Sequence, residues 1–318
     1  MNKAIIGIDI SKHKFDVAYC ISNQKWKDKS FENSSSGFKA FLGWLSDHKI
    51  QDMHAVMEAT GRYGEDLAHF LYVAGHNVSI VNPAQIKHYG KSLLRRTKTD
   101  KVDSRLIAEF AQRHQLSLWK PLAPSFQSLK DQARCLEAFK KDETQTSNRL
   151  EGAKDIIVQK MLKERLVHIQ KQISDLELKI KNLIDDDPTL THTVELLITI
   201  PGIGNTSAIN LLAELPDLSL FKCAKQLAAF AGLNPSIKRS GISVKGRESI
   251  SKTGSRELRK IFFFPAMAVL RMVALKPFID RLKEKGKKGK VIVVAVMRKL
   301  LHNVFGVLKT QTPFQNYA

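Results

Sequence analysis

Four acidic residues in the first third of the chain constrain its fold more than any other feature. Asp9 and Glu58 each end a short apolar run that is typical of a buried strand. Asp100 and Asp103 stand three residues apart where a helical pattern begins. Carboxylates at two strand ends and on one helix can converge on a single point, where they repel unless cations lie between them. Hard oxygen ligands suit Mg²⁺ or Mn²⁺, and two such ions can clamp a phosphodiester, so the pattern predicts nucleic-acid phosphoryl transfer.

The spacing of apolar residues predicts a mixed α/β domain around these acids. Period-two apolar runs predict strands and helical spacing predicts helices. The expected strands are 4–9, 15–21, 26–31, 53–57 and 78–81, and the expected helices are 38–48, 65–74 and 103–114. Three strands, helix, strand, helix, strand, helix is the plan of a ribonuclease-H-like domain. In that plan the acid of the first strand lies at the centre of the sheet, beside the acids of the fourth strand and the last helix.

The rest of the chain is predicted to be all-α. A stretch with two prolines, 118–124, marks a boundary, and 125–187 is almost wholly helical. Its apolar residues alternate at spacings of four and three, which is a heptad seam. The seam residues are Leu162, Leu166, Ile169, Ile173, Leu176, Ile180 and Leu183. We interpret 125–187 as a coiled-coil arm, either self-associating or folded back as a hairpin; one long helix of a bundle is the alternative. The predicted domains are therefore 1–120, 125–187 and 190–318.

Charge predicts a polyanionic partner. The formal net charge is +20, and residues 190–318 hold 21 Lys and Arg against 7 Asp and Glu, a net of +14, which leaves 30 against 24, a net of +6, for the rest. Nucleic acid or an anionic membrane surface would satisfy this charge. No apolar run is expected to reach the length of a membrane span, since 261–270 is too short. The cysteines Cys20, Cys135 and Cys223 lack metal-ligand spacing, and no signal peptide is recognised, so we expect a cytosolic, nucleoid-associated protein without a membrane partner.

A helix-hairpin-helix-like element is predicted near residue 200. An apolar segment, 196–200, leads into Pro201-Gly202-Ile203-Gly204, and a second helical pattern follows. Gly202 and Gly204 would let backbone N–H groups approach a phosphate at the start of the second helix. A tight turn between packed helices explains the same residues about equally well.

Basic residues near the acids and in two polar segments, 236–253 and 281–290, are the other candidates for nucleic-acid contact. Charges of this kind would grip phosphates with strong salt dependence. They are Lys98, Lys101, Arg105, Lys238, Arg239, Lys245, Arg247, Lys252, Lys287, Lys288 and Lys290.

Ser240 is a candidate nucleophile within the first of these segments. A serine hydroxyl is a poor nucleophile unless a base or a metal activates it, and neighbouring cations could stabilise a pentavalent phosphate. From the residues alone, a loop that merely touches phosphate is the better explanation. Four further serines compete for the role, namely Ser243, Ser249, Ser251 and Ser255, and Asp16 and Glu109 are weaker alternatives to the four acids.

The motifs together resemble a known family. They run in the order G-I-D, M-E-A-T-G, N-P, K-T-D-x-V-D-S-R, I-P-G-I-G, L-A-A-F-A-G-L-N-P, S-G, S-K-x-G and G-K-K-G-K. In that order, over nearly the whole chain, they are similar to the DEDD transposases of the insertion-sequence-110 family, including its 1111 branch. The resemblance implies a RuvC-like (ribonuclease-H fold) domain, a coiled coil and a C-terminal transposase domain.

The resemblance also implies a mechanism. Asp9, Glu58, Asp100 and Asp103 match the family's acidic tetrad, a site for Mg²⁺ or Mn²⁺, and Ser240 matches its catalytic serine. A covalent serine–DNA intermediate, donor and target DNA, and a structured bridge RNA as guide are implied. So are dimers that assemble into a tetramer with composite sites.

Two other functions remain open from the sequence. One is a metal-dependent nuclease of the Holliday-junction type that uses water as its nucleophile, and the other is a non-catalytic RNA- or DNA-binding protein. Ser240→Ala separates the recombinase from the nuclease, because only the former needs the hydroxyl. Asp9→Asn separates both enzymes from the binding protein, because it should abolish cleavage and leave binding intact.

Overall fold

The computed structural model describes residues 3–22, 25–59, 61–93, 100–215, 217–236, 239–240, 244–245, 249–287 and 289–315. For Asp100, Lys101, Arg239, Ser240 and Lys245 it describes the backbone alone. The chain divides into two compact units, Met1–Pro121 and Leu122–Ala318. Each unit has its own hydrophobic core, so each is described by itself.

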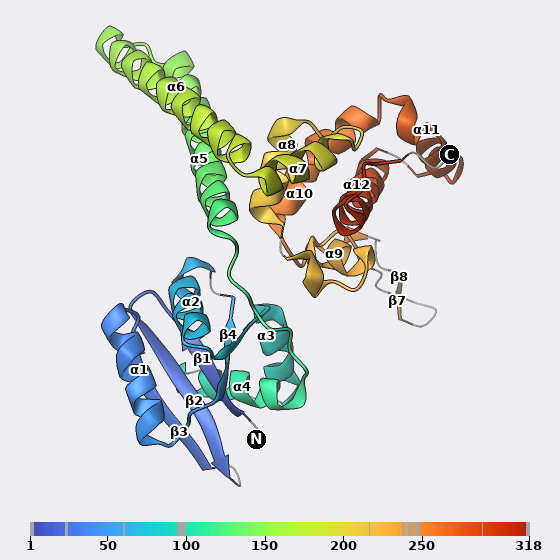
Figure 1. The fold of residues 1–318 in the computed structure, drawn as a ribbon. Helices are drawn as coiled ribbons and strands as arrows, with labels where there is room; N and C mark the ends of the chain where they lie inside the picture. Colours follow the sequence, from blue (N-terminus) through green and yellow to red (C-terminus); the bar gives the residue numbers. More distant parts are fainter. Residues whose placement is uncertain are drawn as a thin grey trace. The chain divides into compact units, whose positions relative to one another are not determined.

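A five-stranded mixed sheet forms the centre of the first unit (Figure 1). Its strands are β1 (Ala4–Ile10), β2 (Lys14–Ser22), β3 (Lys25–Glu32), β4 (Met53–Glu58) and β5 (Asn77–Val81), in the spatial order β3-β2-β1-β4-β5. The first three strands pair antiparallel, whereas β4 is parallel to both β1 and β5. The central position of β1, between β2 and β4, is the one that the sequence predicts.

Helices cover both faces of this sheet. They are α1 (Ser35–Asp47), α2 (Glu65–Val73), α3 (Pro83–Ser92) and α4 (Asp100–Arg113), with a 3₁₀ turn, η1 (Gly61–Gly64), before α2. On one face, Phe15 and Ile8 pack with Phe41 of α1 and Leu71 of α2. On the other, Val56 packs with helices α3 and α4. Alternate residues of each strand therefore enter different cores, as a period of two requires.

The sequence predicts a mixed α/β unit correctly but misses α3. No helix is predicted between the strand 78–81 and the helix 103–114. In the structure the Asn82 side chain accepts a hydrogen bond from the Ala84 backbone N–H (2.8 Å), and Pro83 occupies the first turn of the helix. An N-cap residue followed by proline is a helix-start signal, and it was available in the sequence.

A long helical hairpin begins the second unit. Helices α5 (Pro124–Gly152) and α6 (Ile156–Asp185) pack along each other, joined by residues 153–155 (Figure 1). The predicted seam is buried at Ile169, Ile173 and Ile180. Lys140 of α5 lies 2.6 Å from Glu177 of α6. The segment 125–187 therefore folds back on itself as a hairpin, which is one of the two arrangements predicted for it. Its assignment as a coiled coil stays a prediction.

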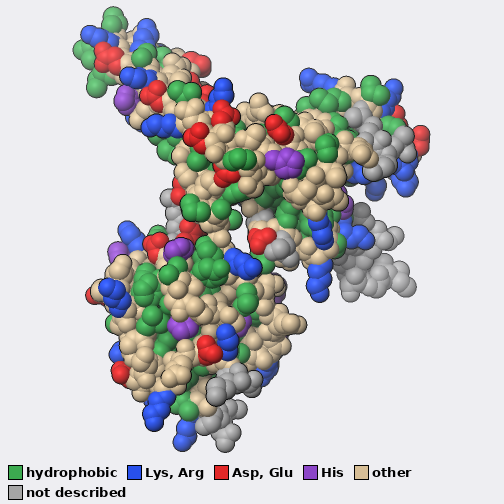
Figure 2. All heavy atoms as spheres, viewed as in Figure 1, with side chains coloured by type: hydrophobic (Ala, Val, Ile, Leu, Met, Phe, Trp, Pro, Cys, Tyr) green, Lys and Arg blue, Asp and Glu red, His purple; other side chains and the backbone are tan. Residues whose placement is uncertain are grey.

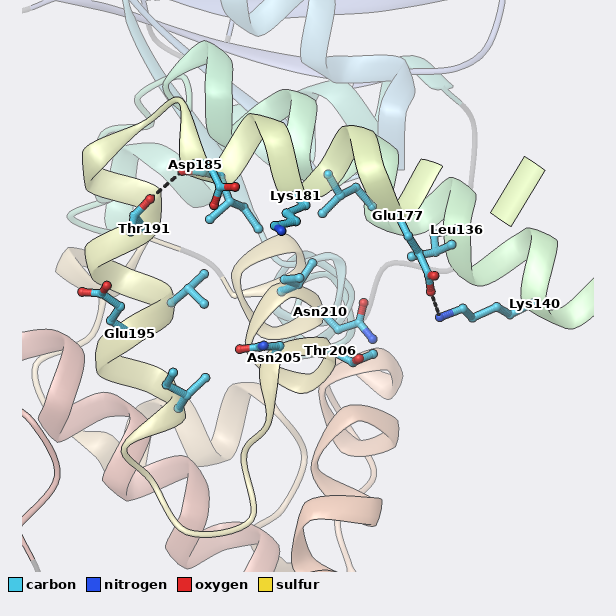
Figure 3. A pocket seen from close by; sticks show the side chains of 15 residues that line it. Leu136, Lys140, Glu177, Lys181, Asp185, Thr191, Glu195, Asn205, Thr206 and Asn210 are labelled. Atoms are coloured by element: carbon cyan, nitrogen blue, oxygen red, sulfur yellow. Dashed lines mark hydrogen bonds and ion pairs between the residues drawn. The ribbon is translucent and has the colours of Figure 1, made fainter. Parts of the chain in front are cut away.

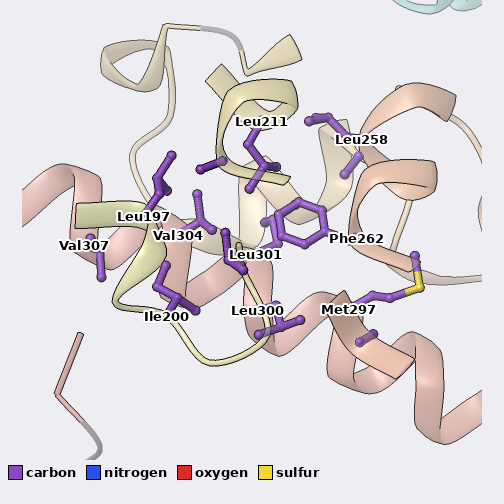
Figure 4. Packing of buried hydrophobic residues seen from close by; sticks show 14 of the residues in the cluster. Leu197, Ile200, Leu211, Leu258, Phe262, Met297, Leu300, Leu301, Val304 and Val307 are labelled. Carbon is purple, nitrogen blue, oxygen red and sulfur yellow. The ribbon is translucent and has the colours of Figure 1, made fainter. Parts of the chain in front are cut away.

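The remaining helices share one core with the hairpin. They are α7 (Pro188–Ile198), α8 (Asn205–Glu214), α9 (Ala224–Phe230), α10 (Arg256–Val269), α11 (Lys276–Glu284) and α12 (Lys290–Thr310), with short 3₁₀ turns η2 (Leu218–Leu220) and η3 (Val273–Leu275). Two pairs of two-residue strands lie between α9 and α10, β6 (Pro235–Ser236) with β9 (Ser249–Ile250) and β7 (Arg239–Ser240) with β8 (Val244–Lys245). Phe262 of α10 packs beside Leu300, Leu301 and Val304 of α12 in this core (Figure 4).

Helix α12 corrects one expectation. Among the described helices it is the one that has the length and apolar composition of a membrane span, with a mean hydropathy of 1.8, so the expectation that no apolar run is long enough is wrong. Its side chains nevertheless pack inside the helical unit, where Val296, Leu300, Leu301 and Val304 are fully buried. The helix is therefore apolar because it lies at the centre of a core.

Candidate active site

Strand register places two of the predicted acids side by side. Ile8 of β1 lies opposite Met57 of the parallel strand β4, so the next residues, Asp9 and Glu58, are neighbours at the carboxyl ends of the two strands. Adjacent strands are about 4.8 Å apart. Both acidic residues are partly buried. The sheet thus supplies two neighbouring carboxylates, contributed by segments almost fifty residues apart in sequence.

The same row continues onto β2. Asp16 lies directly opposite Asp9 in the antiparallel pair, with Ser30 of β3 beyond it. Asp16 is 6% exposed, accepts a hydrogen bond from the Ser30 hydroxyl, and lies 3.3 Å from the Lys14 ammonium. Three carboxylates therefore stand on consecutive strands. Because Asp16 has two partners on β2 and β3, we interpret it as a structural acid of the row.

All three carboxylates lie on the sheet face that α4 covers. Ile8 packs in the core on the opposite face, whereas Val56, two residues before Glu58, packs against α4. Helix α4 approaches β1 closely at Gly7, where an added Cβ would lie 2.1 Å from the Ser104 carbonyl oxygen. The residue that permits this approach is two positions from Asp9.

Asp100 and Asp103 belong to the first turn of α4. Asp100 is the first residue of the helix and Asp103, which is partly buried, follows three residues later. Residues three apart share one face of a helix. The alternative acid Glu109 lies in the second half of the same helix and is also partly buried.

The donor chemistry fits a hard divalent cation, although a complete ligand set is not gathered by the described side chains. Among them, no three His, Cys, Asp or Glu lie close enough together to hold a metal ion. Asp9 and Glu58 supply two neighbouring oxygen donors, and Asp100 has only its backbone described. Carboxylate oxygens are the ligands that Mg²⁺ and Mn²⁺ prefer.

Ser240 lies on a small hairpin of the second unit. It pairs with Val244, and Arg239 pairs with Lys245, in the β7–β8 ladder. The β6–β9 ladder forms the base of this hairpin, with Pro235 opposite Ile250. The Ser240 side chain and the competing Ser243 lie outside the described residues.

Comparison with known proteins decides the family. Residues 6–159 match a DEDD transposase model of IS110 elements, described as "Transposase", and residues 194–280 match "Transposase IS116/IS110/IS902 family". The pilin gene-inverting protein of Moraxella bovis is 38% identical over 99% of this chain and 98% of its own length. The chain belongs to the IS110 family of transposases.

More distant relatives agree with this assignment. The transposase for insertion sequence element IS1328 of Yersinia enterocolitica is 24% identical over 82% of each chain. The transposase for IS1111A of Coxiella burnetii is 24% identical over 86% of this chain and 79% of its own length. This IS110-family transposase is a DNA-cutting and joining enzyme that acts in recombination, and its DEDD domain is of a kind that uses divalent metal.

The predicted nucleic-acid contacts of the transposase fall into three groups. Arg105 pairs with Asp28 of β3, so its charge is used within the first unit. The exposed cations Lys252, Lys287 and Lys290 lie in the second unit. The others lie outside the described residues, namely Lys98, Lys238, Arg247 and Lys288 entirely, and Lys101, Arg239 and Lys245 in their side chains.

The exposed cations of the transposase extend beyond those predicted. Figure 2 shows Lys and Arg gathered over the part of the helical unit that carries α11, whereas acidic and basic side chains alternate along the α5–α6 hairpin. Lys276, Arg281, Lys283, Lys285, Lys287 and Lys290 are all exposed there. Their clustering in sequence was visible as the 281–290 segment, and α11 extends it by one turn.

Structure changes the interpretation of the helix-hairpin-helix-like element. Gly202 has a φ of 85°, and a Cβ there would lie 2.5 Å from the Val269 side chain and 2.8 Å from the Pro265 carbonyl oxygen of α10. Gly202 therefore lets the turn between α7 and α8 pack closely against α10. Gly204 precedes α8, is exposed, and has open space around the position of a Cβ.

An open pocket of about 520 Å³ lies among α5, α6, α7 and α8 (Figure 3). Lys140, Lys181, Asn205, Thr206 and Asn210 are among its polar lining. No pattern in the sequence could have located it, because four helices contribute to its wall. It contains none of the predicted catalytic residues.

Proposed function

We propose that this transposase recombines DNA at specific sites through a covalent Ser240–DNA intermediate, guided by a structured bridge RNA. Residues 1–120 are the RuvC-like, ribonuclease-H-fold domain, 125–187 the coiled-coil linker, and 190–318 the domain that carries the serine. Asp9, Glu58, Asp100 and Asp103 hold Mg²⁺ or Mn²⁺ in this proposal.

The register of the central strands is the observation that carries the proposal. It brings Asp9 beside Glu58 on the face covered by α4, and α4 begins with Asp100. All four acids fall within the residues matched by the DEDD transposase model. Carboxylate oxygens are the ligands that Mg²⁺ and Mn²⁺ prefer, so two neighbouring carboxylates support a cation-binding role.

Within the site, each part of the chain has a defined task. The bound metal would lower the pKa of a hydroxyl and offset the charge that develops on phosphate. The Ser240 hydroxyl oxygen bonds to phosphorus while the bond from phosphorus to a deoxyribose oxygen breaks, and the serine proton ends on the departing oxygen. The bond between serine and phosphorus replaces the broken phosphodiester bond, so its free energy is conserved. A hydroxyl of a second DNA end can then attack the same phosphorus, which joins the new ends and releases the serine.

Basic residues of the second unit would grip the nucleic-acid backbones. The exposed cations on and after α11 supply charge that does not depend on sequence. Base pairing with the bridge RNA would then select donor and target DNA. A dimer that assembles into a tetramer would allow the acids of one protomer to act with the serine of another.

Site-specific inversion is a second candidate outcome of the same chemistry. It is favoured by the full-length similarity to a protein whose name describes pilin gene inversion. Excision, insertion and inversion all require strands to be cut and rejoined between two sites. The orientation and placement of the two sites would decide which outcome follows.

A test for a covalent adduct decides between the enzyme mechanisms. Purified transposase would be incubated with the noncoding RNA of its element, donor and target DNA, and Mg²⁺, then resolved on a denaturing gel. An adduct with wild-type protein and with Ser243→Ala, but not with Ser240→Ala, supports the proposal. Cleavage that survives Ser240→Ala without any adduct refutes it in favour of a water-using nuclease.

A further inference from the structure

Two segments hold the base of the hairpin that carries Ser240. Residues 230–236 leave α9, and residues 249–255 lead into α10. Backbone N–H groups of the second segment donate to carbonyls of the first, Ser251 to Asn234 (2.8 Å) and Ser255 to Phe230 (2.8 Å). The β6–β9 ladder adds the pairing of Ser236 with Ser249. The two ends of the hairpin are therefore joined along their length.

Two glycines let these segments touch. Gly254 has a φ of 137°, and a Cβ there would lie 2.1 Å from the Phe230 carbonyl oxygen and 2.9 Å from the Gly232 nitrogen. Gly232 has a φ of 68°, and its Cβ would lie 2.6 Å from the Arg259 guanidinium. Both positions have a positive φ, which favours glycine. At Gly254 the contact is with backbone atoms and leaves no room for a Cβ, whereas a Cβ at Gly232 would displace the Arg259 guanidinium.

Arg259 joins the two segments from α10. Its Nη1 atom lies 2.9 Å from the Ala231 carbonyl oxygen and 3.2 Å from the carbonyl oxygens of Gly254 and Ser255. Because Nη1 has only two hydrogens, the three carbonyl oxygens share these two donors. The preceding residue, Leu258, is fully buried, which fixes the helix that carries the guanidinium.

We propose that Arg259, Gly232 and Gly254 form a clamp that positions the Ser240 hairpin for attack on DNA phosphate. This inference rests on the proposed role of Ser240. Among the described residues, each strand of the β6–β9 and β7–β8 ladders has two residues, and ladders this short are marginally stable by themselves. The positioning contact therefore lies where the two segments meet, at one guanidinium that reaches carbonyls of both.

A positioning role predicts a specific kinetic defect. A reacting atom displaced by about 1 Å can cost about a hundredfold in rate, even when substrate still binds. Loss of the clamp should therefore lower the maximal rate of adduct formation by about ten- to a hundredfold. The DNA concentration at half-maximal rate should change by less than about threefold, because the exposed cations are untouched.

Two variants remove the clamp by different means. Arg259→Gln removes the guanidinium, and Gly254→Ala drives a methyl group into the Phe230 carbonyl without changing charge. Arg256→Gln, at an exposed position of the first turn of α10, is the matched control, and Gly306→Ala on α12 is the matched glycine control, with nothing within 4 Å of its added Cβ. Adduct rates would be measured across DNA concentrations in the complete RNA–DNA assembly.

A local measurement tests the clamp independently of chemistry. Hydrogen exchange of the Ser251 and Ser255 amides should become faster in both clamp variants and stay unchanged in both controls. Thermal unfolding would be followed in parallel.

Each outcome has a defined meaning. Unchanged maximal rates in both clamp variants, or a loss explained wholly by weaker DNA binding, overturn the inference. It is also overturned if both variants unfold below the assay temperature, since the contacts would then serve the fold as a whole. If Ser240→Ala still forms the adduct, or wild-type protein forms none, the proposed function fails instead, and faster amide exchange would still establish the clamp as a contact.

Discussion

Gly7→Ala tests the close approach of α4 to the sheet, on which the candidate site depends. The added Cβ would lie 2.1 Å from the Ser104 carbonyl oxygen and 2.5 Å from the Ala108 nitrogen, both backbone atoms. Carbon–oxygen contacts are ordinarily at least about 3.3 Å, so α4 must retreat by about 1 Å. Overpacking of this kind lowers the free energy of unfolding by about 1–3 kcal/mol. Because Gly7→Ala clashes with two backbone atoms, we expect a loss near the upper end, at about 3 kcal/mol.

Tryptophan fluorescence can follow this effect in the intact chain. The three tryptophans, Trp26, Trp44 and Trp119, all belong to the first unit, so their emission reports its unfolding alone. The free energy of unfolding falls by about 2 kcal/mol for each 1 M urea, so a loss of about 3 kcal/mol in that free energy lowers the urea concentration at the unfolding midpoint by about 1.5 M. Adduct formation should fall by about a hundredfold, because Asp103 moves with α4 relative to Asp9.

Gly43→Ala is the matched control for that measurement. Gly43 lies within α1, where an added Cβ meets nothing within 4 Å. Replacing glycine with alanine inside a helix should stabilise the unit by about 0.5–1 kcal/mol. A Gly7→Ala midpoint within about 0.3 M of the wild-type value would refute the close packing of α4 on β1.

Three further predictions concern the core, the pH dependence and the site. Phe262→Ala should lower the free energy of unfolding of the second unit by about 3–5 kcal/mol, whereas Phe264→Ala, 75% exposed on the same helix, should change it by less than about 0.5 kcal/mol; calorimetry of the two variants compares them directly. Burial lowers the pKa of His54 in the folded protein. As the pH falls through about 6.5, the imidazole is therefore protonated in the unfolded chain before it is protonated in the folded one, and the free energy of unfolding decreases. The tryptophan-detected urea midpoint should therefore fall between about pH 7.5 and pH 5.5, and an unchanged or higher midpoint at the acidic end would contradict the lowered pKa of the partly buried His54. Asp9→Asn should reduce cleavage and adduct formation by more than about a hundredfold and leave gel-shift affinity for RNA and DNA within about threefold; equal losses of binding and cleavage would show that Asp9 serves the fold.

Local sequence patterns predicted most elements that frame the site. Apolar runs ending in Asp9 and Glu58 correspond to β1 and β4, and the spacing after Asp103 corresponds to the body of α4. These predictions succeed because strand and helix periods depend on residues only a few positions apart. Helix α3 is not among the predicted elements, although its N-cap residue and proline are equally local signals.

Long-range contacts add structural roles to two of the predicted nucleic-acid contacts. Arg105 was expected to meet nucleic acid, yet its partner is Asp28, far away in the sequence on β3. Gly202 was a candidate phosphate contact, yet its missing side chain makes room for α10. In both cases the residue type permits either role. Folding adds a structural neighbour, and the nucleic-acid contact stays a prediction.

The sequence by itself determined the family, the acids that are candidates for catalysis and most of the strands and helices that hold them, because these follow from residue identity and short-range periodicity. Only the tertiary structure decided which side chains are neighbours. Register added Asp16 to the row beside Asp9, and packing buried the apolar helix α12 in a core. It also brought Arg259 against the base of the Ser240 hairpin. Such contacts join residues that are distant along the chain, and their geometry depends on the packing of whole elements, which no short segment encodes.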